Sequence, residues 1–135
     1  MNRSYLTAAF VLLLTFGLLL LGPARPARAH AAFSHSDPAP GSVLPEHTHQ
    51  VTIWFTEPLE PEFSEIQVLN TEGQQVDNGN SEVLPDDETA MTVSLPTLPD
   101  GTYTVVWRNV STVDGHSLRG SFVLSFGEAL PGAAA

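Results

Sequence analysis

After residue 30, apolar and polar side chains alternate with a period of two, and clusters of Pro, Gly, Asn and Asp interrupt the alternation at short intervals. Val51, Ile53 and Phe55 would lie on one face of an extended segment, with Thr52 and Trp54 on the other. The pattern recurs at 65–68, 91–95, 102–107 and 121–126. No helical period of useful length occurs in this region of the sequence. The pattern therefore predicts an all-β domain, either a sandwich or a barrel.

Six aromatic residues lie within these alternating segments, and we expect them to be core or near-core residues. They are Trp54, Phe55, Tyr103, Trp107, Phe122 and Phe126. The alternative interpretation is that some of them form a platform on which a carbohydrate stacks. The polar and acidic segment 77–88 is expected to be a loop or a weak edge strand.

Residues 1–29 have the features of a cleavable signal peptide. A positively charged start precedes an almost wholly apolar run at 5–21, and a Gly-Pro pair and the small-x-small sequence at 27–29 follow it. Cleavage after Ala29 would leave the 106 residues that begin with His30. Because the apolar run approaches the length of a transmembrane helix, an uncleaved membrane anchor is the alternative.

The rest of the chain is short enough for one domain, predicted at 30–126, with a flexible tail at 127–135.

Without the leader, only Arg108 and Arg119 oppose all 15 acidic residues. Such a surface repels a phosphate backbone and anionic lipids, so we expect a cation as ligand. We expect neither nucleic-acid binding nor stable membrane insertion after cleavage. The chain has no cysteine, which excludes disulfides, thiolate metal sites and thiol nucleophiles.

Cleavage would expose the α-amino group of His30, and this nitrogen and the imidazole Nδ1 could close a six-membered chelate ring on a metal ion. The sequence Asp114-Gly115-His116 offers a carboxylate and a second imidazole across a glycine that tolerates a tight turn. Together these groups supply three nitrogens and one oxygen, a set that suits square-planar Cu(II). Taken alone, Asp114-Gly115-His116 is also consistent with an ordinary Asp-Gly turn beside a solvated histidine.

The remaining histidines carry weaker signals. His47 and His49 could form an accessory metal site on one face of an extended segment, although a solvated loop that leads into a strand is the favoured interpretation. His35 has no convincing ligand partner in the sequence. Met91 lies within an alternating segment, where we expect it to pack in the core.

Several motifs, in the same order along the chain, resemble those of the CopC copper-resistance family. They are HAAF at 30–33 followed by S-x-PAPGS at 36–42, VTIWFTEP at 51–58, GTYTVVWR at 101–108, Ser111, and DGH at 114–116 followed by G-x-F at 120–122. The resemblance extends from His30 to about Phe126, which is nearly all of the chain after the leader.

This resemblance implies a periplasmic, Ig-like Greek-key β-sandwich that binds one Cu(II) ion. The implied ligands are His30, through its amine and imidazole, Asp114 and His116. Glu57 falls where the family often has an acidic residue near the site, which implies a supporting role beside the ligands. Because Met91 is the only methionine after the leader, we expect a Cu(II)-only protein without the methionine-rich Cu(I) loop of some members.

Three functions are compatible with this sequence. The first is a carrier or buffer, not an enzyme, that serves copper homeostasis or resistance outside the cytoplasm and supplies a separate CopD-like membrane importer. The second is a copper-dependent oxidative enzyme of the polysaccharide-monooxygenase type. Such enzymes share the N-terminal histidine chelate, but the short chain and an Asp114 that fills the coordination plane argue against this reaction. The third is a metal-free Ig-like interaction module, which would leave the pairing of His30 with Asp114-Gly115-His116 unexplained.

Overall fold

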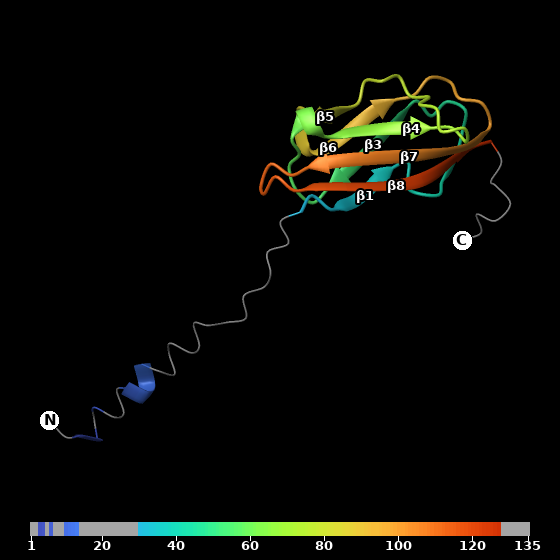
Figure 1. Ribbon diagram of the computed structural model, residues 1–135. Helices are drawn as coiled ribbons and strands as arrows, with labels where there is room; N and C mark the ends of the chain where they lie inside the picture. The colour runs from blue at the N-terminus through green and yellow to red at the C-terminus, as the bar shows by residue number, and fades with distance from the viewer. Residues whose placement is uncertain (1–2, 5, 7–9, 14–29, 128–135) are drawn as a thin grey trace.

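The computed structural model of the protein describes residues 3–4, 6, 10–13 and 30–127 (Figure 1). Residues 30–127 contain eight strands and one short 3-10 helix. These elements are β1 (Phe33–Asp37), β2 (Val43–Leu44), β3 (Gln50–Phe55), η1 (Pro61–Phe63), β4 (Glu65–Leu69), β5 (Glu82–Leu84), β6 (Asp87–Ser94), β7 (Gly101–Val110) and β8 (Ser117–Phe126).

The strands form two four-stranded sheets that face each other as layers (Figure 1). One sheet has the order β1-β3-β6-β5 and the other the order β2-β8-β7-β4. All neighbouring strands are antiparallel except β2 and β8, which are parallel. Strands that are consecutive in the sequence alternate between the sheets over β1 to β5, as Greek-key connections require. The predicted all-β, Ig-like Greek-key sandwich is confirmed.

The sequence pattern identified the central strands but not all of the edge strands. The two short strands β1 and β2 were not predicted, because most of their side chains are exposed or half-buried and show no apolar alternation. Pairing with β3 and β8 holds these strands in place. The acidic segment 77–88 includes the edge strand β5, as expected, but its last two residues already belong to β6.

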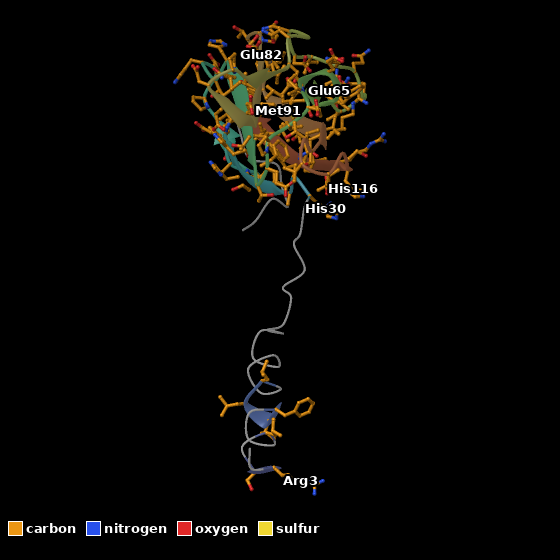
Figure 2. The ribbon with its side chains drawn as sticks, turned by 90° about the vertical axis from the view of Figure 1, so that its left-hand side faces the viewer. Arg3, His30, Glu65, Glu82, Met91 and His116 are labelled. Carbon is orange, nitrogen blue, oxygen red and sulfur yellow. The ribbon has the colours of Figure 1, made fainter. Side chains whose placement is uncertain are left out.

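The space between the sheets holds a single apolar core, and all of its residues lie between Ala31 and Phe126. Residues 30–127 therefore have their own core, which permits folding without residues 1–29. The fully buried members include Val51, Ile53 and Met91. The prediction for Met91 is confirmed, and Figure 2 shows it in the interior of the domain.

Five of the six predicted aromatic core residues pack in or against this core, since Phe55, Tyr103 and Phe126 are buried and Trp107 and Phe122 are half-buried against them. The sixth, Trp54, is not a core residue. It is out of phase with its inward neighbours on β3, and it stacks on His35 of β1 with ring centroids 4.6 Å apart and an interplanar angle of 3°. Phe55, Tyr103, Trp107, Phe122 and Phe126 each contact another aromatic ring of the domain rather than forming an open platform.

Gly120 on β8 provides space for the indole of Trp107, its partner on β7. A Cβ atom at this glycine would lie 2.3 Å from Cζ2 of Trp107, whose ring packs against Phe33 and Phe55. We therefore expect Gly120→Ala to lower the free energy of unfolding by about 1–3 kcal/mol through overpacking. Chemical denaturation measures this change, and Ser121→Ala at the next, exposed position should stay within about 0.5 kcal/mol of the wild type. Equal stabilities of the two variants would contradict the prediction.

Among the described residues, no helix is long and apolar enough to span a bilayer. Most of the predicted signal peptide, residues 14–29 with its cleavage site, lies outside the described part of the chain, as do residues 128–135 of the predicted tail. Both remain predictions.

Candidate metal centre

The three predicted ligands lie together at one end of the sandwich, where the N-terminal segment runs beside the loop between β7 and β8 (Figure 1). One potential ligand atom from each of His30, Asp114 and His116 lies within 4.8 Å of the others. Oδ2 of Asp114 is 3.1 Å from Nδ1 of His30 and 2.8 Å from Nδ1 of His116. The two imidazole rings meet edge to face, with centroids 4.9 Å apart, and Figure 2 shows them side by side.

The loop that carries Asp114 and His116 is a tight turn with its own hydrogen bonds. Gly115 has a φ of +71°, a conformation that favours glycine. Its backbone N–H donates to the carbonyl of Ser111 (2.9 Å), and the N–H of Ser111 donates to the carbonyl of His116 (3.0 Å). The N–H of His116 donates to Oδ1 of Asp114 (3.0 Å), which leaves Oδ2 directed at the imidazoles. The glycine thus lets both ligand side chains of the turn face one point.

The electrostatics of this turn keep the Asp114 carboxylate ionised. The hydrogen bond from the His116 backbone N–H is the main cause that holds the pKa of Asp114 below its ordinary value. The His116 imidazole and, less strongly, His30 act in the same direction, while partial burial opposes them. Asp114 is 16% exposed, whereas the His30 and His116 side chains are 49% and 65% exposed. A half-buried anion beside two accessible imidazoles is a favourable arrangement for a cation that arrives from solvent.

Comparison with known proteins identifies the family. Residues 33–127 match the model of the CopC domain. The chain belongs to the CopC family. The match includes Asp114 and His116 and begins three residues after His30, so the N-terminal ligand lies just outside it.

The chain matches two relatives in sequence, and the match covers a different share of each relative's length. The copper transport protein CutJ of Bacillus subtilis (strain 168) is 39% identical over 102 residues, which are 75% of this chain and 19% of CutJ. The chain thus spans about a fifth of the length of CutJ. Protein YobA of Escherichia coli (strain K12) is 31% identical over 98 residues, 72% of this chain and 78% of YobA.

Solved structures show the same sandwich. CopC from Methylosinus trichosporium OB3b superposes with a TM-score of 0.66 and 26% identity, covering 72% of this chain and 93% of that one. PcoC from Escherichia coli, described as a methionine-rich copper resistance protein, has a TM-score of 0.60 and 26% identity, covering 73% of this chain and all of that one.

Glu57 contacts the loop that carries Asp114 and His116 through Ser111. Its Oε2 accepts a hydrogen bond of 2.6 Å from the hydroxyl of Ser111, a fully buried residue that also accepts the N–H of Val113. Glu57 therefore contacts the start of the ligand loop and not the ligand atoms themselves.

The other histidines join no group of three potential metal ligands within residues 30–127. His35 stacks on Trp54, and its Nδ1 lies 3.1 Å from the hydroxyl of Ser34. His47 and His49 lie between β2 and β3, in agreement with the loop interpretation.

Two residues that contact the N-terminal segment were not predicted from the sequence, Asn109 and Thr56. The sequence pattern of β7 does contain one indication that Asn109 is unusual. Tyr103, Val105 and Trp107 alternate with outward residues on β7, so the next inward position holds a polar amide where an apolar side chain is expected. A buried amide of this kind needs hydrogen-bond partners, which only the tertiary structure reveals.

Proposed function

We propose that this protein is exported and binds one Cu(II) ion as a carrier or buffer in copper homeostasis or resistance. The observation that carries the proposal is the convergence of His30, Asp114 and His116 within 4.8 Å. Signal peptide cleavage after Ala29 would place the site in the periplasm or another compartment outside the cytoplasm and add the amine of His30 to the donor set. Three nitrogens and one carboxylate oxygen fit the tetragonal geometry that Cu(II) prefers.

The identities of the relatives support copper as the cation. CutJ is named a copper transport protein, and PcoC is a copper resistance protein. PcoC is also described as methionine-rich, whereas this chain has two methionines, of which Met1 is in the leader and Met91 is fully buried in the core. Thioethers are the ligands that Cu(I) prefers, so we propose that this protein serves Cu(II) alone.

A carrier role fits the donor set better than oxidative catalysis does. With Asp114 as a third protein ligand beside the His30 chelate and His116, the coordination plane is filled, while a monooxygenase keeps a position open for its substrate. A separate CopD-like membrane importer is the proposed recipient of the ion. Glu57 is proposed to support the site by holding Ser111 at the base of the ligand loop.

Titration of residues 30–135 with Cu(II) followed by electron paramagnetic resonance tests the proposal. We expect one tight tetragonal site with nitrogen couplings. His116→Ala removes one nitrogen and should weaken the affinity, measured by chelator competition, by about 10-fold or more. His49→Ala, outside the cluster, is the matched control and should leave the affinity unchanged. Equal losses in both variants, or no binding by the wild type, would refute the assigned site.

A second assay separates the carrier from the oxidase. The copper-loaded protein is incubated with ascorbate and a panel of insoluble and soluble polysaccharides, and the soluble products are analysed by mass spectrometry. We expect no oxidised oligosaccharides above the level produced by free copper. Oxidised products that disappear in His116→Ala would favour the enzyme instead.

A further inference from the structure

Ala31, the residue that follows His30, is held in the core of the sandwich. It is fully buried, and its carbonyl oxygen accepts a hydrogen bond of 2.8 Å from Nδ2 of Asn109 on β7. The Asn109 side chain is itself 0% exposed. An N-terminal segment normally frays unless contacts fix it. This buried hydrogen bond therefore fixes the position of the segment that carries His30.

The other end of the same amide contacts the hairpin that carries the remaining ligands. Oδ1 of Asn109 accepts the backbone N–H of Leu118 (3.3 Å), which follows His116 by two residues at the start of β8. One buried side chain thus contacts the segment of His30 and the strand next to His116. Both polar groups of the amide are used for these contacts, as burial requires.

Thr56, just after β3, contacts the same segment from the other sheet. Its hydroxyl accepts the N–H of Ala32 (3.0 Å) and donates to the carbonyl of His30 (3.1 Å), and its backbone N–H donates to the carbonyl of Ala32 (2.9 Å). The backbone on both sides of Ala31 is therefore fixed. His30 retains freedom mainly about its own bonds, which suits a residue that must close a chelate ring.

We propose that Asn109 is the positioning residue of the metal centre, which holds the N-terminal chelate within reach of Asp114 and His116. The proposal rests on the proposed function and assigns to Asn109 a share of the copper affinity although it touches no ligand atom. A chelate on a loose segment must be ordered when the ion binds, and this entropic cost weakens affinity. A segment ordered beforehand by Asn109 avoids that cost.

Packing alone does not account for an asparagine at this position. The preceding inward residues of β7 are Tyr103, Val105 and Trp107, and a leucine of similar volume would continue the apolar series. An amide is favourable at this buried position only because its donor and its acceptor form hydrogen bonds with the two segments that bear the ligands. A purely structural role predicts that its loss lowers stability and leaves the metal site of the folded protein unchanged.

The test replaces Asn109 with leucine in residues 30–135 and measures Cu(II) affinity by chelator competition, together with the paramagnetic resonance spectrum of the folded protein. We expect an affinity about 10- to 100-fold weaker, the range for partners that orient metal ligands, and an altered or heterogeneous spectrum. Thr56→Val, at an exposed position, should weaken the affinity in the same direction.

The matched control is Thr92→Val, which removes a buried hydroxyl that bonds to the Val51 carbonyl and lies 3.1 Å from the Thr52 hydroxyl, in the sheet that does not contain Asn109. It should lower stability and leave copper affinity and spectrum unchanged. The proposal is overturned if Asn109→Leu binds copper within threefold of the wild type, or if Thr92→Val loses as much affinity as Asn109→Leu.

A copper-free measurement separates this proposal from the proposed function. By amide hydrogen exchange, Ala32 should exchange at least about 10-fold faster in Asn109→Leu than in the wild type, whether or not copper binds. If Asn109→Leu does not fold, exchange of the Asn109 side-chain amide in the wild type decides. Exchange only through global unfolding supports the proposal, and exchange through local opening of the N-terminal segment overturns it. A wild type that shows this protection but binds no Cu(II) refutes the proposed function and leaves the positioning of the segment intact.

Discussion

A chain that begins at His30 is expected to bind Cu(II) at least about 100-fold more tightly than the same chain with one extra residue before His30. The free α-amino nitrogen has an ordinary pKa of about 7.7, so a metal ion displaces its proton at little cost near neutral pH. An added residue converts this amine into an amide, whose nitrogen binds Cu(II) only after it loses its proton. The amine–imidazole chelate of His30 is therefore lost, and the ion must either bind the imidazole alone or displace the amide proton, which costs affinity.

Chelator competition gives the two affinities, and electron paramagnetic resonance reports how many nitrogens remain coordinated. A variant with one extra residue after Ala135 is the control, because it has the same added mass at the other end of the chain. Circular dichroism confirms that all three chains are folded. Equal affinities for the two N-terminal forms would show that only side chains bind the ion, and the amine would then be removed from the ligand set.

Phe126→Ala is expected to lower the free energy of unfolding by about 3–5 kcal/mol. Phe126 is 1% exposed at the end of β8, and its ring meets that of Tyr103 edge to face with centroids 5.6 Å apart. Truncation removes this contact and leaves a cavity between the sheets that rigid strands cannot close. Urea denaturation of residues 30–135 measures the change. Phe63→Ala, at a position 54% exposed in η1, should change stability by less than about 0.5 kcal/mol.

The same variant also separates stability from metal binding. Phe126 ends the strand that Ser117 begins, so it lies at the opposite end of β8 from the ligand loop. Below its unfolding transition, Phe126→Ala should bind Cu(II) with the affinity of the wild type. A loss of less than about 1 kcal/mol in stability would show that the core rearranges around the missing ring. A loss of copper affinity in the folded variant would show that the two ends of the sandwich are coupled.

The central strands could be predicted because one face of each is buried. Val51, Ile53 and Phe55 recur every second residue, and the structure buries all three on β3. The same alternation could have placed Trp54 on the outer face, where it stacks on His35, since it is out of phase with its neighbours. Its size and aromatic character favoured the core interpretation, and the periodicity was the better guide.

The strand ends could not be predicted by the same means. β7 and β8 remain paired over ten residues each, up to Val110 and Ser117, although the sequence around Arg108 and Arg119 is polar. Backbone hydrogen bonds between neighbouring strands do not require apolar side chains, so the ladder continues where the apolar pattern stops. Alternation therefore identifies a strand by its buried part and underestimates its length.

The ligands of the candidate site could be named from the sequence because their chemistry is local. A histidine behind a cleavage site and an Asp-Gly-His turn are both short motifs, and Gly115 has the positive φ that such a turn requires. The distances between His30, Asp114 and His116 could not be derived in this way, since the first two lie 84 positions apart in the sequence. The parts of the fold that bring them together are the buried Ala31 and the hairpin of β7 and β8.

The sequence by itself thus determined the fold class, the core face of each central strand and the types of donor atom offered to a cation. These properties depend on residue type and on spacing along the chain, and both can be read directly from the sequence. The tertiary structure alone decided that Asn109 turns its buried amide toward Ala31 and Leu118, and that Glu57 contacts the ligand loop through Ser111. The physical reason is that a buried polar group must find its partners in three dimensions, and those partners lie on strands that are distant in the sequence.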